Sequence, residues 1–274
     1  MPKPALSRAR TPAVSQTRAV DENGNALSVG VAGEYPLTLY VDGREIVTLM
    51  TMGRMPEELA IGWLRNQRAL FSVGEIEEVR VDWEVNAAAV YTRSGLPPLS
   101  EKRAMTSGCG QGTMFGDLMD FVSETRFCRP RKFSAAALFD LLSHIRDRDT
   151  VYKAAGAVHA CALAEIKNDA CEMLIFTEDV GRHNAVDAIG GWMWLHDVGG
   201  GGKVFYTTGR LTSEMVIKCA QMEIPYLVSR SGLTRMGLEV AKTTGITMLG
   251  RAINKRYLLF TGGEHFDGEK KSTA

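Results

Sequence analysis

Residues 172–195 read EMLIFTEDVGRHNAVDAIGGWMWL, an apolar run, a polar turn and a second, longer apolar segment. The first seven residues have the length of a buried strand, and residues 183–195 are long enough for a helix. The same order recurs twice downstream, with KVFYTT before SEMVIKCAQME and PYLVS before TRMGLEVAKTT. Alternation of this kind predicts a layered α/β fold with a largely parallel sheet.

The elements around this stretch predict three sections. Further strands are expected at AVHACALAEI, GITMLG and RYLLFTG, and a helix should follow Ser134 as its N-cap. Another helix should open at Pro56, with Glu57 and Glu58 in its first turn. We therefore expect a disordered basic tail over residues 1–26, a β-rich subdomain over 27–130 with a mobile cysteine loop at 106–113, and the α/β domain over 131–274.

The composition is that of a folded protein with no net charge, so no long-range electrostatic field would attract a charged partner. The 274 residues are 45% hydrophobic, and Lys+Arg and Asp+Glu both total 32. A balanced charge argues against a nucleic-acid or membrane-surface partner, and no apolar run approaches the roughly 18 residues of a spanning helix. Five cysteines at irregular spacing (109, 128, 161, 171 and 219) indicate a reducing compartment, so we expect a cytoplasmic protein.

Polar residues follow three of the predicted strands directly. In open α/β sheets ligands collect beyond the carboxyl ends of the strands, and helix N-termini with arginines suit phosphate groups. We therefore expect an anionic, phosphate-bearing ligand at this edge. An alternative is that the arginines only brace the loops by pairing with Asp179, Asp187 and Glu214. The candidate residues are Arg182, His183, Asn184, Gly209, Arg210, Ser213, Arg230 and Ser231.

Two side chains have a possible chemical role. His183 is either a general base or a structural hydrogen-bonding group at the start of its helix. Cys109 lies in TSGCGQGT (106–113), among glycines and a few residues before a predicted helix that Thr113 would cap. A helix dipole lowers a thiol pKa, so Cys109 is the candidate reactive thiolate, the alternative being a small residue in a tight turn.

The other cysteines and the histidines do not form a recognisable metal set. Cys161, Cys171 and Cys219 lie in apolar contexts and should be buried and inert. His159 and Cys161 share a strand face, but no further pair completes a zinc site, so no metal is expected.

The sequence resembles the FdhD family of formate dehydrogenase accessory sulfurtransferases. The resemblance rests on EDVGRHNAVD (178–187), TTGRLTSEMVIKCA (207–220), IPYLVSRSGLT (224–234) and SGCGQG (107–112). It implies a cytidine-deaminase-like α/β fold without zinc, in a cytoplasmic homodimer. It further implies that Cys109 receives persulfide sulfur from a cysteine desulfurase. The sulfur would pass to a bis-molybdopterin guanine dinucleotide, of molybdenum or tungsten, for formate dehydrogenase; a guanine nucleotide would serve as an analogue.

The resemblance also marks a C-terminal segment for the cofactor, residues 251–256, and several departures. That segment is Arg251, Ala252, Ile253, Asn254, Lys255 and Arg256, with Arg251 in place of an aromatic residue. Gly112 replaces a second loop cysteine of the family, which puts any step that uses a resolving thiol in doubt. The alternatives are a carrier that delivers the cofactor without covalent sulfur transfer and, third, a deaminase-like nucleotide hydrolase.

Overall fold

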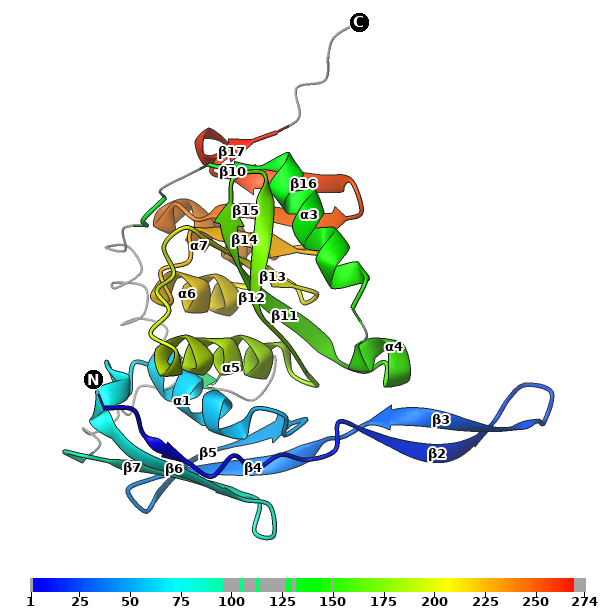
Figure 1. Ribbon diagram of the computed structural model, residues 1–274, viewed down its shortest axis with the longest axis vertical. Helices are drawn as coiled ribbons and strands as arrows, with labels where there is room; N and C mark the ends of the chain where they lie inside the picture. The colour runs from blue at the N-terminus through cyan, green and yellow to red at the C-terminus, as the bar shows by residue number, and fades with distance from the viewer. Residues whose placement is uncertain are drawn as a thin grey trace, which may run out of the picture.

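The computed structural model describes residues 2–95, 104–105, 112–113, 127–129, 132–148 and 150–268. These residues form a six-stranded sheet from the C-terminal half and a five-stranded sheet from the N-terminal part, with helices between and around them (Figure 1). The α/β class expected from the sequence is therefore present.

The six-stranded sheet has the order β12-β11-β13-β14-β15-β16. Each predicted strand of the C-terminal half lies in it. Its members are β11 (His159–Lys167), β12 (Ala170–Asp179), β13 (Lys203–Thr207), β14 (Tyr226–Ser229), β15 (Thr247–Ile253) and β16 (Arg256–Thr261).

The expectation of a largely parallel sheet is wrong. Only β13–β14 and β14–β15 are parallel, and the other three neighbouring pairs are antiparallel. The reason is two tight hairpins, whose turns are Asn168–Asp169 and Asn254–Lys255. Asn168 and Asn254 have φ values of 58° and 52°, which asparagine tolerates, and a two-residue turn can join only antiparallel strands.

Helices cover both faces of this sheet. The helices α5 (Arg182–Leu195), α6 (Ser213–Gln221) and α7 (Arg235–Thr244) pack on one face, and α3 (Ala135–Arg146) packs on the other (Figure 1). The side chain of Ser134 accepts a hydrogen bond from the Ala137 amide, which confirms the predicted N-cap of α3. Gly245 ends α7 with a φ of 74°, as a helix C-cap glycine does. The short helix α4 (Val151–Ala155) follows α3.

The N-terminal sheet has the order β1-β6-β7-β4-β5 and is covered by one helix, α1 (Pro56–Asn66). Its strands are β1 (Ala5–Leu6), β4 (Tyr35–Val41), β5 (Arg44–Thr51), β6 (Ile76–Asp82) and β7 (Ala87–Thr92). Helix α1 begins at Pro56 as predicted, with two glutamates in its first turn.

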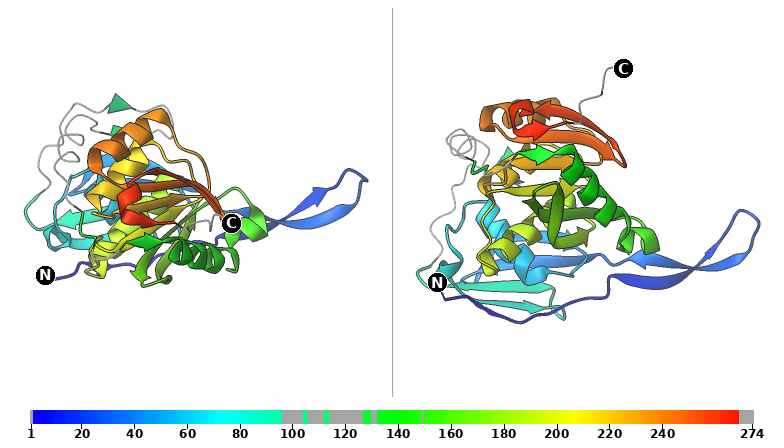
Figure 2. Two further views of the ribbon diagram at one scale, coloured as in Figure 1. Left: turned by 90° about the horizontal axis from the view of Figure 1, so that it is seen from above. Right: turned by 45° about the horizontal axis from the view of Figure 1, so that its top comes forward.

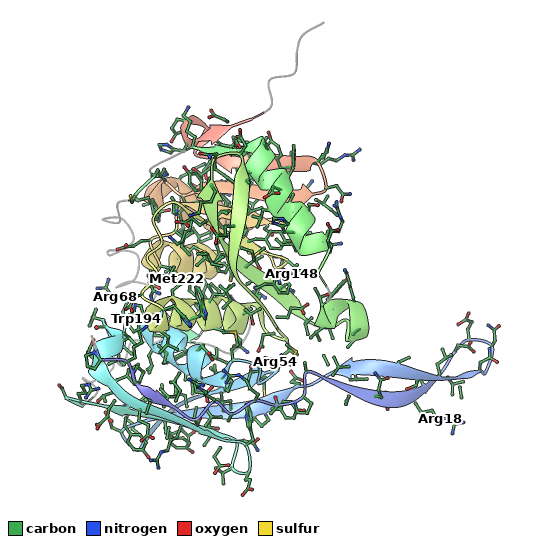
Figure 3. The ribbon with its side chains drawn as sticks, viewed as in Figure 1. Arg18, Arg54, Arg68, Arg148, Trp194 and Met222 are labelled. Atoms are coloured by element: carbon green, nitrogen blue, oxygen red, sulfur yellow. The ribbon has the colours of Figure 1, made fainter. Side chains whose placement is uncertain are left out.

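Helices α1 and α5 pack against each other and join the two halves of the molecule. A Cβ atom built on Gly62 would lie 1.7 Å from the carbonyl oxygen of Asp187, and one on Gly191 would lie 1.9 Å from that of Glu58. Figure 3 shows Trp194 of α5 at this boundary, where the Arg65 guanidinium lies 5.3 Å from a ring centroid. Only glycine permits this approach, so these two positions set the helix separation.

The N-terminal residues differ from the expected disordered tail. Strand β1 joins the five-stranded sheet, and β2 (Val14–Val20) pairs with β3 (Ala26–Ala32) in an antiparallel hairpin. This hairpin, the β2–β3 arm, projects from the body, with Arg18 far out along it (Figures 2 and 3). Asn23-Gly24, with Gly24 at φ 84°, is the turn signal that favours a hairpin here.

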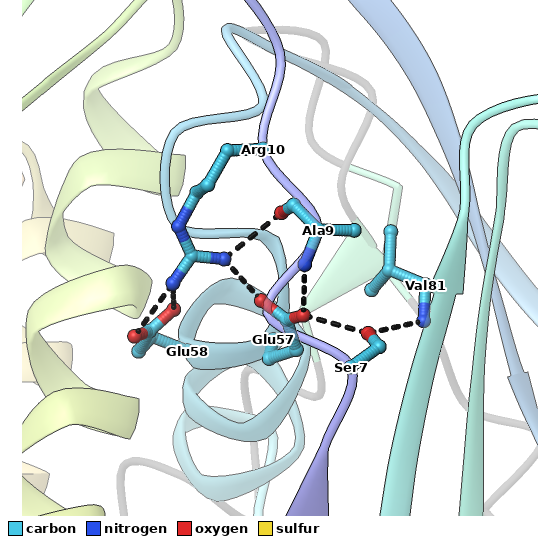
Figure 4. A network of polar contacts seen from close by, with 6 residues as sticks. All are labelled: Ser7, Ala9, Arg10, Glu57, Glu58 and Val81. Carbon is cyan, nitrogen blue, oxygen red and sulfur yellow. Dashed lines mark hydrogen bonds and ion pairs between the residues drawn. The ribbon is translucent and has the colours of Figure 1, made fainter.

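A polar network holds the segment before the arm onto α1 (Figure 4). The Glu57 carboxylate, whose side chain is fully buried, accepts hydrogen bonds from the Ser7 hydroxyl at 2.7 Å and the Ala9 amide at 2.8 Å. The Arg10 guanidinium contacts both Glu57 and Glu58. These contacts, which the charge count could not reveal, explain why basic residues of the segment are ordered.

The remaining elements are short. They are β8 (Ala104–Met105) paired with β9 (Gly112–Thr113), β10 (Phe133–Ser134) paired with β17 (Phe266–Asp267), and the 3-10 turns η1 (Val73–Glu75) and η2 (Gly263–His265). Cys109 lies outside the described residues, and so does the helix expected after Thr113. The predicted role of that cysteine therefore stays a prediction.

Candidate functional site

The carboxyl ends of β12, β13 and β14 lie at one edge of the six-stranded sheet. Strand β11 is antiparallel to both β12 and β13, so these two run in the same direction, and β14 is parallel to β13. The N-terminal end of β11 lies at the same edge, with His159 opposite Asp179. The edge predicted from three separate motifs is therefore a single place in the structure.

A cavity of about 690 Å³ opens at this edge, on the α3 side of the sheet. Its apolar lining comes from Leu142, Ile145, Val158, Phe176 and Tyr206. Its polar lining is mostly cationic or hydroxyl-bearing, and consists of Arg146, Thr150, Tyr152, Lys153, His159, Glu178, Thr208, Arg230, Ser231 and Asn254. A volume of this size with an apolar floor and a few polar groups suits a small organic ligand. A second hollow of about 410 Å³ lies along β1 and β6, away from these groups.

Helix α4 forms one wall of the cavity, and Glu178 determines its position. The buried Glu178 carboxylate accepts hydrogen bonds from the amides of Val151 at 2.6 Å and Tyr152 at 3.1 Å. The Thr150 hydroxyl caps the same turn by accepting from the Lys153 amide at 3.1 Å. A carboxylate at the start of a helix satisfies its free amides, so Tyr152 and Lys153 are held at the cavity.

Four cationic or titratable groups lie at this edge of the sheet, and two of them, His159 and Arg230, line the cavity. Burial lowers the pKa of the half-buried His159 imidazole, and the neighbouring charges of Arg182 and Arg210 lower it further. Arg230 lies on the cavity lining itself. The edge therefore carries an excess of positive charge, as an anion-binding site requires.

Asp179 and Asn184 face the N-terminal sheet rather than the cavity. The Asp179 carboxylate accepts from the Thr51 hydroxyl at 2.5 Å, the Met52 amide at 3.0 Å and the Asn184 amide group at 3.0 Å. Asn184 also donates to the Met50 carbonyl at 2.6 Å. Burial raises the pKa of Asp179, although these hydrogen bonds act in the opposite direction. Both residues therefore connect the two halves of the molecule.

His183 is buried between α5 and α6. Its Nε2 atom lies 3.1 Å from Oε2 of Glu214 without the alignment of a hydrogen bond. Burial lowers the pKa of His183 to about 2, helped by the charges of Lys218, Arg182 and His159. The imidazole is therefore neutral at pH 7, and neither ring nitrogen makes a hydrogen bond within the described residues. Both the general-base role and the structural hydrogen-bonding role of His183 stay predictions.

The other residues of the predicted edge are divided between buried and exposed positions. Gly209 is buried against the stem of Arg182, and its carbonyl accepts from the Ser229 hydroxyl at 2.7 Å. Arg210 is exposed, and Ser213 begins α6 in a partly exposed position. Ser231 donates its amide to the Ser229 hydroxyl at 2.9 Å. Of this group, Ser231 and Arg230 line the cavity.

The segment 251–256 forms the β15–β16 hairpin, and half of it reaches the cavity. Ala252, Ile253 and Asn254 line the cavity, whereas the cavity lining does not include Arg251, Lys255 or Arg256, which are exposed. The segment that the family resemblance marked is thus adjacent to the site, through its apolar and amide side chains.

Sequence reasoning missed the contribution of α3 and α4 to the site. Arg146, Tyr152, Lys153 and Glu178 all line the cavity, and His159 was considered only as a metal ligand. The signal for His159 was its place at the start of a strand. No local signal marks α4, because its position depends on Glu178, a residue 26 positions from Tyr152.

Three of the four cysteines in the described ranges are buried and are poor nucleophiles. Cys161, Cys171 and Cys219 are buried, and burial raises the pKa of the first two to about 12 and of the third well above its usual value. This agrees with the expectation that they are inert. Cys128 is free and exposed. Within the described ranges no group of three or more His, Cys, Asp or Glu side chains could hold a metal ion.

Comparisons with known proteins give the relationship of the chain. Proteins named Sulfur carrier protein FdhD are similar to it. The one from Geobacillus kaustophilus (strain HTA426) is 30% identical over 234 residues, or 84% of this chain and 88% of that protein. The one from Bacillus pumilus (strain SAFR-032) is 28% identical over the same length and shares.

A solved structure agrees with these sequence relatives. It is a crystal structure of a protein from Desulfotalea psychrophila, described as a formate dehydrogenase accessory protein. It superposes with a TM-score of 0.73 at 25% identity and covers 92% of this chain and 98% of its own. No helix in the part of the chain that the structure describes is long and apolar enough to cross a membrane. The profile of the FdhD/NarQ family matches residues 32–267, and this chain belongs to that family.

Proposed function

We propose that this protein is a sulfur carrier that accepts persulfide sulfur on Cys109 and delivers it to a guanine-dinucleotide molybdenum or tungsten cofactor destined for formate dehydrogenase. The names of its relatives, sulfur carrier and formate dehydrogenase accessory protein, support the general role. A cysteine desulfurase is the proposed donor. The cytidine-deaminase-like layering and the dimeric state belong to the same proposal.

One observation carries the proposal: the cavity combines an apolar lining with cationic side chains, which are Arg146 of α3, Lys153 of α4 and Arg230 at the end of the parallel strand β14. A nucleotide has the matching parts, since its base is planar and largely apolar and its phosphates are anionic. Phe176 and Leu142 provide apolar surface for a base, and Arg230, His159 and Lys153 provide donors for phosphate. We assign the guanine nucleotide portion of the cofactor to this cavity.

Loading of Cys109 with sulfur needs its thiolate form and involves no net oxidation or reduction. The Cys109 sulfur attacks the terminal sulfur of the desulfurase persulfide, a new S–S bond forms, and the desulfurase thiolate leaves. Delivery of that sulfur to the metal as sulfide consumes two electrons. Because Gly112 stands where the family resemblance implies a second loop cysteine, an external thiol supplies these electrons. It attacks the Cys109 sulfur, forms a mixed disulfide with it and releases the outer sulfur as sulfide.

A pair of crossed variants tests the two halves of the proposal. After treatment with a desulfurase and cysteine, the intact chain should gain about 32 Da under non-reducing conditions, the mass of one sulfur atom. Cys109→Ala should lose this gain and still bind guanosine diphosphate in calorimetry. Arg230→Gln should keep the gain and bind the nucleotide about tenfold more weakly, the loss of one charge-assisted contact.

Two outcomes would contradict the proposal. If Cys109→Ala is loaded as well as the parent chain, the nucleophile is another thiol, and exposed Cys128 is the next to replace. If the parent chain binds the nucleotide but accepts no sulfur, the chain is a carrier that delivers the cofactor without covalent transfer, which the single loop cysteine would favour.

A further inference from the structure

A buried polar network joins three helices beneath the sheet edge. We use this name for Asn66 of α1, His183 and Asp187 of α5, and Glu214 and Lys218 of α6. Lys218 donates to Oδ2 of Asp187 at 2.7 Å, and Asn66 donates to Oδ1 of the same carboxylate at 2.8 Å. The Lys218 and Asp187 side chains are 2% and 0% exposed. Both charges are therefore removed from water.

The spacing of the network follows helix geometry. His183 and Asp187 are four residues apart on α5, and Glu214 and Lys218 are four apart on α6, so each pair lies on one helix face. Lys218 also lies 3.9 Å from Glu214, which in turn lies 3.1 Å from His183. The contacts thus run from the core of the molecule to the first turns of both helices.

Stability alone does not account for this arrangement. The network is set in the apolar core that Val186, Ile189, Met215 and Met222 help to form. Burying an ion pair costs desolvation free energy that the pair's attraction barely offsets, and apolar replacements are often as stable. A buried pair does provide a fixed geometry, because displacement of either helix would leave a buried charge without its partner.

We propose that Lys218 is a positioning residue that, through Asp187, fixes the start of α6 against the start of α5 and thereby places the buried Arg182, which does not itself line the cavity, near the cavity residue His159. This rests on the function proposed above. The Arg182 stem packs on Gly209, where an added Cβ would lie 2.9 Å from its Cδ. Gly209 precedes the first residue of α6 by four positions, so movement of α6 would displace Arg182.

The charge of Lys218 also acts on the neighbouring histidine. The charged and titratable groups around His183 are Lys218 and Glu214 from α6, Arg182 from its own helix and His159 from β11. Burial is the main cause of its low pKa, and Lys218 is the next. His183 accordingly stays uncharged and leaves the arginines to determine the charge of the edge.

The first test compares two equivalent substitutions in the full chain. Lys218→Met keeps the apolar stem and removes the charge, and Lys242→Met does the same at an exposed position of α7. Affinity for guanosine diphosphate should fall about tenfold in Lys218→Met and change less than about twofold in Lys242→Met. Unchanged affinity in Lys218→Met would overturn the proposal.

A double variant separates positioning from simple stability. Lys218→Met with Asp187→Asn removes both charges and keeps an oxygen that can accept from Asn66. Thermal stability should return toward that of the parent chain, because no unpaired charge remains, while nucleotide affinity should stay weak. Recovery of both stability and affinity would show a merely structural pair and overturn the proposal.

Histidine NMR tests the effect of Lys218 on the buried polar network without any ligand. In the parent chain the His183 ring should stay neutral down to pH 5, and its ring-nitrogen chemical shifts at pH 7 should change in Lys218→Met, because the charge of Lys218 acts on the ring. If the parent chain binds no nucleotide, the proposed function fails while these spectra still decide on the network. His183 ring shifts that are the same in both chains would overturn the role of Lys218.

Discussion

At the scale of single residues, the family motif EDVGRHNAVD mainly builds the structure. Glu178 positions α4, Asp179 and Asn184 contact the N-terminal sheet, and Asp187 pairs with Lys218. The alternative in which the arginines brace the loops by pairing with these acids has no support at Asp179 or Asp187, which accept from hydroxyl, amide and lysine groups. The cations of the cavity lining are Arg146, Lys153 and Arg230, which lie outside this motif.

His159 predicts a pH dependence of anion binding. Its pKa lies below 6.5, so the ring is neutral at pH 7 and gains a charge as the pH falls through that pKa. A bound phosphate favours the charged form, so the charge of the ring adds to the affinity as the pH falls. Calorimetry at pH 7.5 and 5.5 should show the parent chain gaining roughly fivefold over His159→Gln across this range. Because both proteins bind the same nucleotide, the ligand's own titration cancels, and a constant ratio would refute the role.

At the scale of elements, the crossing of α1 and α5 determines how the two sheets share one core. Residues of α5 such as Ala188 and Leu195 belong to the core under the N-terminal sheet, while Ile189 and Met193 belong to the core under the C-terminal sheet. Helix α5 is therefore apolar around most of its circumference, as a helix buried between two layers must be.

Gly62→Ala tests this crossing. Alanine should favour an isolated helix by about 1 kcal/mol, but its Cβ would lie 1.7 Å from the Asp187 carbonyl oxygen, so the helices must separate. We expect a net loss of about 2 kcal/mol and a melting temperature lower by about 4 °C. Gly199→Ala is the control, since its Cβ meets nothing within 4 Å. Equal stability of the two variants would mean that the helices adjust without cost.

At the scale of the whole molecule, buried polar contacts between distant segments connect the N-terminal sheet to the ligand-binding edge. Asp179 ends β12, and the Thr51 and Met52 groups that bond it lie 128 and 127 positions away. A change at the end of β5 would therefore shift the start of α5, where Arg182 and His183 lie.

Asp179→Asn should weaken this connection. The asparagine side chain has an NH2 group in place of one carboxylate oxygen. The buried groups that donate to that oxygen therefore lose their acceptor, at a cost of about 3 kcal/mol. Urea unfolding should show this loss, with an earlier phase if the N-terminal sheet separates first. Asp147→Asn, at a site where the carboxylate is exposed, should change stability by less than about 0.5 kcal/mol. A loss no larger than that of the control would contradict the connection.

The sequence by itself determined the order and kind of the C-terminal elements, the α1 and α3 starts, and the edge where the polar turns meet. These features depend on local periodicity and capping, which are determined by residues adjacent in the sequence. The tertiary structure decided the strand directions and the order of the N-terminal segment. It also decided which side chains of the edge face the cavity, since Glu178 caps a helix and Asp187 meets Lys218 only after distant residues come together. Such pairings form and stabilise only the folded chain, so no local sequence pattern predicts them.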